Sequence, residues 1–581
     1  MDVSNSLYKF RFLLKIDKNI RYGIISSVVV LIYVLILRKS SIWIVHNDTC
    51  SMLVIVNGDL SGVFSPNMLF TNNLFSQILT SLYSISHSIQ WYYLLLLLSI
   101  VFSIWVIIYR TLICTDRMAI KNRLIVLFIT IVIANCIFYG YFTTISFTES
   151  ATACGLALLF YLITNDDYRI HDYLIVLILS ILCFGIRDAV MEAVLPYIIV
   201  FLLLTMIKNK FRLRDAAIYI MIFCVVYLMS LADMELCTEE QKSTREINSY
   251  RSIIADYNGG YPEYKDNINL YSDLGMNEDD YRVLNLSNGL IDFFRKDVLK
   301  SFTEHYAKNK YKLLSSKCMR EMKSRLGELF HTYHGTFWTM LFLTLAFLLY
   351  YLIMSKDHFD ILVISFACLI SISELMYLLY NGRIVKRATE IVFYILIIIV
   401  GGIFIKKINS FYQCINNLNT ELVYIVLMCI YSFCILYSSS VFYDEKSVCD
   451  SAMADTVLPE KYFMDNSGYR YYLGSRHTDY YDLFDTIHPQ KRNFCKFGGW
   501  ISETPEWKSA LCVEYNNVWD ALAYRGDLRF YFDEWEMMIL EHYLNTHGYN
   551  VKAVCENVNT DDIDFEIWRF EDKRTYYKCQ K

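Results

Sequence analysis

The segment that decides the fold reads WYYLLLLLSIVFSIWVIIY and covers residues 91–109. It contains no charged residue, and a helix of this length reaches across the ~30 Å hydrocarbon core of a bilayer. The loop that follows, 110–123, carries Arg110, Arg117, Lys121 and Arg123. Short loops rich in Lys and Arg stay in the cytoplasm. We therefore expect segment 91–109 to cross a membrane and to end at its cytoplasmic face.

Similar apolar segments recur along the chain of 581 residues, which is 55% hydrophobic and 19% charged. An ordinary soluble domain has about 25% charged residues. We expect eleven membrane-spanning helices, at residues 22–37, 91–109, 124–140, 151–164, 173–186, 190–207, 216–232, 336–354, 361–380, 388–405 and 422–443. The pattern predicts an α-helical polytopic membrane protein in a lipid bilayer. Outside the loops that flank the membrane spans, the sequence has no stripe of basic and aromatic residues of the kind that would indicate a nucleic-acid partner.

The basic residues also predict the orientation. They concentrate before the first span and in the loops 110–123, 208–215 and 406–421. With eleven spans and a cytoplasmic N-terminus, all four regions lie inside. The first apolar segment ends at Arg38-Lys39 without a cleavage site of small residues, so it reads as an uncleaved span. A composition rich in Ile, Lys, Tyr and Asn indicates an AT-rich bacterial genome, and hence the bacterial plasma membrane.

Four segments then face outward: the loop 38–90, the insert 233–335, the turn 381–387 and the tail 444–581. Residues 1–443 form the membrane domain. Within the first loop, residues 67–86 would form a helix with apolar side chains on one face and polar side chains on the other. This pattern predicts a helix that lies in the membrane interface. The tail mixes short apolar runs with turn signals such as Gly498-Gly499. We expect it to form a small extracytoplasmic α/β domain with one helix at 534–547.

Unusual charges lie at the outward ends of the spans. Asp188 and Glu192 are four residues apart and would share a helix face. Charged groups at membrane depth are costly and usually face a cavity or a partner. The candidates are Asp48 as the catalytic residue and, for substrate binding, Asp59, Glu149, Arg187, Asp188, Glu192, Arg383, Lys386 and Arg387. Asp48 as a solvated loop acid, and Arg187, Asp188 and Glu192 as a packing network, remain alternatives.

The turn 381–387 places three cations, Arg383, Lys386 and Arg387, on the side where the positive-inside rule disfavours them. Arginine suits bidentate phosphate binding, although these side chains could also simply snorkel to lipid headgroups. A carboxylate beside such cations fits sugar transfer from a polyprenyl phosphate. The carboxylate would deprotonate an acceptor hydroxyl, and the cations would stabilise the departing phosphate. No organic cofactor is required, and a divalent metal, Mg²⁺ or Mn²⁺, stays open.

Several blocks resemble a group of bacterial multispan proteins similar to the GT-C glycosyltransferase superfamily. The blocks are Asn47-Asp48, Gly58, Gly62, Ser65-Pro66, Asn72, Leu82-Tyr83 and Trp91-Tyr92; Ile186-Arg187-Asp188 with Pro196; Met276 to Tyr281 through Asp292; and Gly382-Arg383 with Arg387. The resemblance implies a GT-C-like fold and a catalytic acid in the first outer loop, which is Asp48. Such loops often hold paired acids. Here Thr49 follows Asp48, which leaves Asp59 as the second acid.

The leading hypothesis is a membrane glycosyltransferase of GT-C type, active in cell-envelope polysaccharide biosynthesis. Its donor would be a sugar on a polyprenyl phosphate or diphosphate, and its acceptor an extracytoplasmic glycan, lipid or protein. One alternative is a polysaccharide polymerase or ligase, which would depend on the turn 381–387 rather than on Asp48. Another is a transporter or flippase of lipid-linked saccharides. The chain shows neither the internal repeat nor the cytoplasmic acid cluster that would favour transport.

Overall fold

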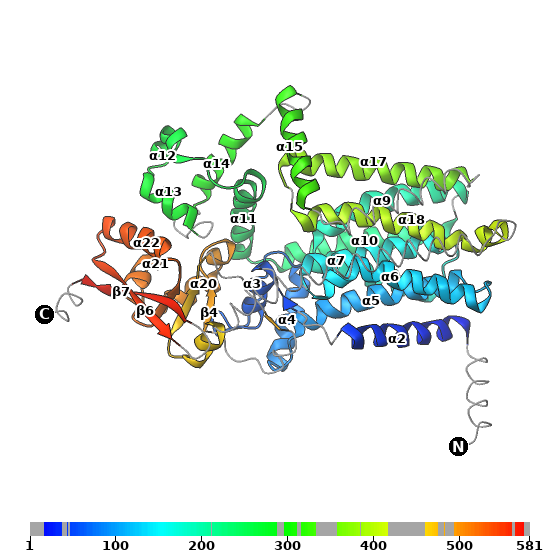
Figure 1. The fold of residues 1–581 in the computed structure, drawn as a ribbon, viewed down its shortest axis with the longest axis horizontal. Coiled ribbons are helices and arrows are strands. Elements are labelled where there is room, and N and C mark those ends of the chain that lie inside the picture. The colour runs from blue at the N-terminus through cyan, green and yellow to red at the C-terminus, as the bar shows by residue number, and fades with distance from the viewer. Residues whose placement is uncertain are drawn as a thin grey trace, which may run out of the picture.

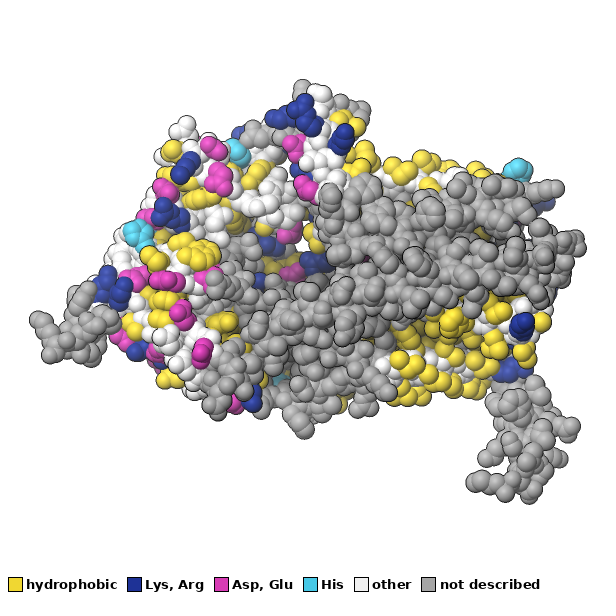
Figure 2. Space-filling model, viewed as in Figure 1, with side chains coloured by type: hydrophobic (Ala, Val, Ile, Leu, Met, Phe, Trp, Pro, Cys, Tyr) yellow, Lys and Arg dark blue, Asp and Glu magenta, His cyan; other side chains and the backbone are white. Residues whose placement is uncertain are grey.

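The computed structural model describes residues 17–37, 43–44, 47–143, 145–210, 212–286, 295–310, 315–332, 357–383, 385–415, 459–474, 481–482, 493–559 and 564–573. A bundle of long helices occupies one end of the molecule, and the insert and the C-terminal domain occupy the other (Figure 1). On the face shown in Figure 2, the side chains of the bundle that are coloured by type are mostly hydrophobic, whereas acidic and basic side chains are scattered among the others at the opposite end.

The bundle is built from nine long helices of the described chain. They are α2 (Lys18–Leu37), α5 (Trp91–Cys114), α6 (Ile120–Thr143), α7 (Phe147–Thr164), α8 (Ile170–Ile186), α9 (Asp188–Lys208), α10 (Leu213–Leu236), α17 (His358–Asn381) and α18 (Lys386–Ile415). Helix α7 is buried and packs against α5, α8, α9 and α18. Its small residues permit close approach. A Cβ at Gly155, for example, would lie 2.9 Å from Cγ2 of Val194 in α9.

Seven helices of the described residues are long and apolar enough to cross a membrane. Their apolar ranges are Lys18–Ile36, Trp91–Cys114, Phe147–Thr164, Asp188–Lys208, Leu213–Leu236, His358–Asn381 and Arg387–Ile408, and Ile170–Ile186 is a shorter apolar helix. The predicted spans 336–354 and 422–443 lie outside the described residues. The prediction of a polytopic helical membrane protein is confirmed, while the count of eleven spans stays a prediction.

The basic loops come together in pairs. Lys18, at the start of α2, forms an ion pair of 2.5 Å with Asp116 in the loop after α5. Asp357 pairs with both Lys208, at the end of α9, and Lys407 in α18. Loops that were expected to share one side of the membrane are therefore neighbours in space. Their cytoplasmic location stays a prediction.

The first loop forms two helices that pack into the protein, α3 (Asn47–Val56) and α4 (Asn73–Ile85). Asn72 caps α4 by accepting a hydrogen bond from the backbone N–H of Leu74. Helix α4 occupies most of the predicted interfacial helix 67–86. Its polar residues Asn73 and Ser76 are buried, whereas Ile78 and Ile85 are 49% and 78% exposed. Part of the polar face thus points into the protein, and part of the apolar face points outward.

The insert is helical and has its own aromatic core. It contains α11 (Glu239–Asn258), η1 (Tyr264–Asp266), α12 (Ile268–Asp273), α13 (Glu278–Asn285), α14 (Lys296–Asn309) and α15 (Ser316–Thr332). Helix α11 begins with a capping box formed by Thr238 and Gln241 and ends at Gly259, whose φ of 77° closes the helix. Tyr261, Tyr271 and Phe302 form the centre of the insert's core.

The described part of the tail contains a five-stranded sheet with the strand order β4-β2-β5-β7-β6. The strands are β2 (Arg470–Leu473), β4 (Phe494–Lys496), β5 (Leu528–Tyr531), β6 (Val551–Asn559) and β7 (Asp564–Asp572). Strand β2 runs parallel to β4 and β5, and β7 runs antiparallel to β5 and β6. The helical segments are η5 (Trp500–Glu503), α20 (Pro505–Leu511), α21 (Val518–Tyr524) and α22 (Glu534–Thr546). A two-residue strand, β1 (Trp43–Ile44), pairs with β3 (Tyr481–Asp482) and links the first loop to the tail.

Candidate functional site

Asp48 connects three distant parts of the chain. It lies in the first turn of α3. Its Oδ2 accepts a hydrogen bond of 3.2 Å from Nη2 of Arg387, near the start of α18. Its Oδ1 accepts one of 2.9 Å from Nε1 of Trp500, in the C-terminal domain. The side chains of Asp48 and Arg387 are only 24% and 28% exposed. The structure thus joins the predicted acid to one of the predicted phosphate-binding arginines.

The surroundings of Asp48 favour its ionised form. Burial raises the pKa of this carboxyl, but the charge of Arg387, the hydrogen bond from Trp500 and the charge of Arg251 together hold the pKa below its ordinary value. Arg251 belongs to α11, is buried, and donates a hydrogen bond of 3.0 Å from Nε to Oδ1 of Asn248. The sequence analysis missed Arg251 and Trp500. Near neutral pH, Asp48 is therefore a carboxylate in a cationic environment.

Arg187 lies at the same site, at the junction between α8 and α9. Its guanidinium carbon is 4.7 Å from the ring centroid of Phe70 and 5.3 Å from that of Phe147. These two rings stack with centroids 5.6 Å apart, and Phe70 meets Trp500 edge-on at 5.4 Å. Arg187 also interacts electrostatically with Asp188, Arg383, Asp48 and Arg387. The aromatic rings therefore fix a third cation close to Asp48.

Arg383 occupies the turn between α17 and α18. Its Nη1 donates a hydrogen bond of 2.9 Å to the hydroxyl of Tyr257, and its guanidinium lies 5.2 Å from the centre of that ring. Within the described residues, its Nε is buried and has no hydrogen-bond partner. Gly382 makes this turn possible, because its φ is +81° and a Cβ there would lie 2.5 Å from the carbonyl oxygen of Tyr257. The side chain of Lys386 lies outside the described residues.

The other predicted acids have local contacts. Asp59 accepts a hydrogen bond of 2.6 Å from Nδ2 of Asn57, in the turn after α3. Glu149 accepts one of 2.9 Å from the hydroxyl of Ser146, which caps α7. Asp188 and Glu192 are exposed in the first turns of α9, and Oδ1 of Asp188 accepts a hydrogen bond from the N–H of Ala189. Among the described residues, no three His, Cys, Asp or Glu side chains form a group that could hold a metal ion.

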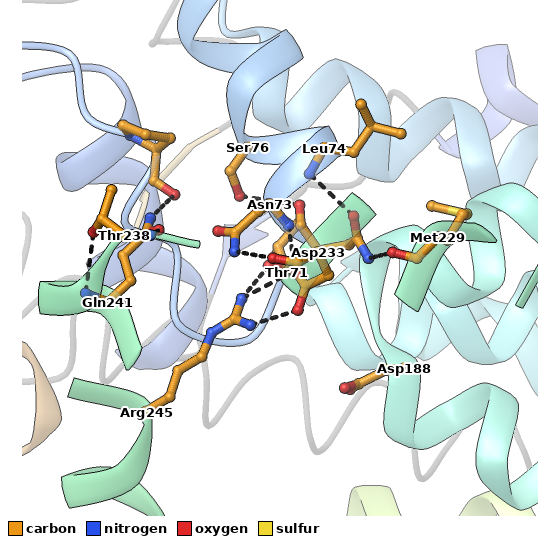
Figure 3. Close-up of polar contacts among 12 residues, drawn as sticks. Thr71, Asn73, Leu74, Ser76, Asp188, Met229, Asp233, Thr238, Gln241 and Arg245 are labelled. Atoms are coloured by element: carbon orange, nitrogen blue, oxygen red, sulfur yellow. Dashed lines mark hydrogen bonds and ion pairs between the residues drawn. The ribbon is translucent and has the colours of Figure 1, made fainter. Parts of the chain in front are cut away.

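A second polar network holds the segment that carries Phe70 (Figure 3). Arg245 of α11 forms an ion pair of 2.5 Å with Asp233 of α10, and its Nη2 donates to the carbonyl oxygen of Thr71. Asp233 Oδ1 also accepts a hydrogen bond of 2.6 Å from the backbone N–H of Asn73. Sequence reasoning missed this pair. The acidic residue Asp233 directly after the predicted span 216–232 was the available signal.

The chain is therefore a polytopic α-helical membrane protein whose charged candidate site lies where the bundle meets the polar end of the molecule. On the face shown in Figure 2, this junction is hollowed, with acidic and basic side chains at its rim. Comparison of the chain with protein-family models, curated proteins and solved structures found no match.

Proposed function

We propose that this protein is a membrane glycosyltransferase. It would transfer a sugar from a polyprenyl phosphate or diphosphate to a hydroxyl of a cell-envelope acceptor, outside the cytoplasm. The observation that carries this proposal is the contact between Asp48 and Arg387 at the end of the bundle. It combines a group that can accept a proton with a group that can bind phosphate.

The charge of the site supports an anionic substrate. Arg251 interacts with Asp48, and Arg187 interacts with Asp48, Arg383 and Arg387. The four guanidinium groups outnumber the two carboxylates that act on them, Asp48 and Asp188, so the site carries a net positive charge. Guanidinium groups match phosphate oxygens with paired hydrogen bonds. A phosphate attached to a membrane lipid would bring its negative charge to the end of the bundle, where these cations lie.

The geometry suggests how the reaction would run. Asp48 accepts the proton of the acceptor hydroxyl, and the hydroxyl oxygen forms a bond to the anomeric carbon of the donor. The bond between that carbon and the phosphate oxygen breaks, and its electron pair stays on the phosphate, which Arg383 and Arg387 stabilise. When the phosphate binds Arg387, Asp48 loses part of its cationic partner. The pKa of the carboxyl then rises, which makes it a stronger base.

One observation favours a second candidate, a polysaccharide polymerase or ligase that depends on the arginines alone. Both oxygens of Asp48 are hydrogen-bonded in this structure, to Trp500 and to Arg387. In contrast, Nε of Arg383 is buried without a partner among the described residues. In such an enzyme, Asp48 would hold Arg387 in place and would not accept a proton.

The test uses the purified protein in detergent and a panel of polyprenyl-phosphate sugars, with release or transfer of the sugar as the readout. The variants are Asp48→Asn and Arg383→Ala. Matched controls are Asp167→Asn and Arg214→Ala, because these residues form an exposed ion pair of 3.2 Å at the other end of α7 and α8. We expect turnover in the wild type and both controls, and its loss in both site variants.

Other outcomes discriminate the alternatives. Turnover that survives Asp48→Asn but disappears in Arg383→Ala would indicate the polymerase or ligase. Saturable binding without turnover of any donor would contradict the enzyme hypothesis and favour a transporter.

A further inference from the structure

The C-terminal domain reaches the candidate site through one side chain. Trp500 is 5% exposed, and its indole N–H donates to Asp48, which precedes it by 452 residues. The indole nitrogen is a donor only, so this hydrogen bond requires an acceptor oxygen at Asp48. The same ring meets Phe70 edge-on at an interplanar angle of 74°. Phe70 in turn lies under Arg187. The ring is therefore oriented from two sides.

The backbone before Trp500 is shaped to present it. Phe497 is fully buried in the C-terminal domain, and its N–H donates a hydrogen bond of 3.0 Å to the carbonyl oxygen of Leu473 in β2. Gly498 and Gly499 follow with φ values of 81° and 71°, which other residues rarely adopt. The chain then enters η5, which packs against α11 of the insert. This turn projects Trp500 from the sheet toward the first loop.

We propose that Trp500 is a positioning residue for Asp48, so that the C-terminal domain completes the site. The indole holds Oδ1 and leaves Oδ2 for Arg387 and the substrate. The role in catalysis rests on the proposed function, whereas the control of the carboxylate by the indole does not depend on which reaction occurs.

The domain is also attached to the first loop at points away from Trp500. Glu506 accepts hydrogen bonds from Ser65, at 2.5 Å, and from Asn67. Arg470 donates to the carbonyl oxygen of Leu60. Replacing Trp500 by Phe would therefore remove the N–H while these contacts and the aromatic ring remain. Trp507→Phe is a matched control, because Trp507 is fully buried in the same domain and donates a hydrogen bond of 3.1 Å to the carbonyl oxygen of Lys496.

The experiment follows the protonation of Asp48 directly. A carbodiimide and an amine modify a carboxyl group in its protonated form, and mass spectrometry of the peptide reports the modified fraction at each pH. The charged groups that act on Asp48 are Arg387, Arg251 and Arg187, and all three are unchanged in these variants. Because the hydrogen bond from Trp500 lowers the pKa of Asp48, Trp500→Phe should move the labelling curve to higher pH. Trp507→Phe should not move it.

Donor turnover is measured on the same full-length proteins. We expect Trp500→Phe to lower kcat/KM by about 10- to 100-fold, as a misplaced catalytic group does. The acid limb of the pH profile of kcat/KM should move to higher pH. A labelling curve that does not move, or that moves equally in Trp507→Phe, would overturn the proposal. A moved curve in a protein that turns over no donor would support the positioning role and refute the proposed function. If Trp500→Phe does not fold, Gly499→Ala, which strains the turn that presents Trp500 because Gly499 has a φ of 71°, should move the curve in the same direction.

Discussion

Neutralising the two partners of the Asp48–Arg387 pair should have unequal effects on stability. At a separation of 3.2 Å and an effective dielectric constant of about 20, Coulomb's law gives about 5 kcal/mol for the pair. Desolvation and partial exposure reduce this to about 2 kcal/mol. Asp48→Asn also loses the attraction to Arg251 and Arg187, so we expect a cost of about 3 kcal/mol. Arg387→Gln relieves the repulsion between Arg387 and Arg187, so we expect this variant to lose only about 1 kcal/mol of stability.

The assay is unfolding in detergent, followed with a thiol-reactive fluorescent dye. The thiols of Cys154 and Cys183 are buried in the folded protein and become reactive when it unfolds. Inorganic phosphate or diphosphate, at ten times its Kd for Asp48→Asn, should stabilise that variant by about 1.4 kcal/mol. The same concentration should stabilise the wild type less. Asp167→Asn and Arg214→Gln, from the exposed pair, should change little. If Arg387→Gln is the more destabilising variant, or if the anions have no effect, the arginines do not act together on Asp48.

Three further predictions concern the supports of the site. Gly382→Ala should lower stability by about 1–3 kcal/mol and reduce donor turnover, since its Cβ would lie 2.5 Å from the carbonyl oxygen of Tyr257; unchanged unfolding would contradict this. Arg245→Met should destabilise by about 2 kcal/mol, and a double-mutant cycle with Asp233→Asn should show coupling, because these half-buried side chains are 2.5 Å apart; additive effects would argue against it. Because the pKa of Asp48 is lowered in the folded protein, its contribution to stability is present above the unfolded pKa of about 3.9 and is lost as the pH falls through the folded value. Unfolding curves recorded down to that range should show the wild type and Asp48→Asn converging.

The fold was largely predictable because the bilayer limits what a spanning segment can be. Apolar length and flanking charge were sufficient to predict the helices α5, α9 and α10. The face of α4 that is buried was less predictable. Its pattern of apolar and polar positions predicted a helix with its polar side toward water, but Asn73 turns inward to Asp233. A buried polar partner from another helix leaves no trace in the local pattern.

The candidate site was predicted only in part. Charges that violated the expected distribution pointed to Asp48, Arg187, Arg383 and Arg387, and the structure links these four. The same reasoning also selected Asp59 and Glu149, which hydrogen-bond within their own turns. Trp500 could not be found in this way, because an aromatic residue in a polar domain is unremarkable by itself. Only the adjacent Gly498-Gly499 turn hinted at an unusual backbone.

The contact between Asp48 and Trp500 also sets an order of events during biosynthesis. A ribosome that adds about 5–20 residues per second needs roughly 20 to 90 s to pass from the first residue to the second, 452 positions later. During that interval the first helices can already be in the bilayer. A nascent or truncated chain would therefore hold its acid without the indole that positions it. On the proposed function, activity would begin only after the domain that carries Trp500 had been exported and folded, so unfinished chains would not consume the lipid-linked donor.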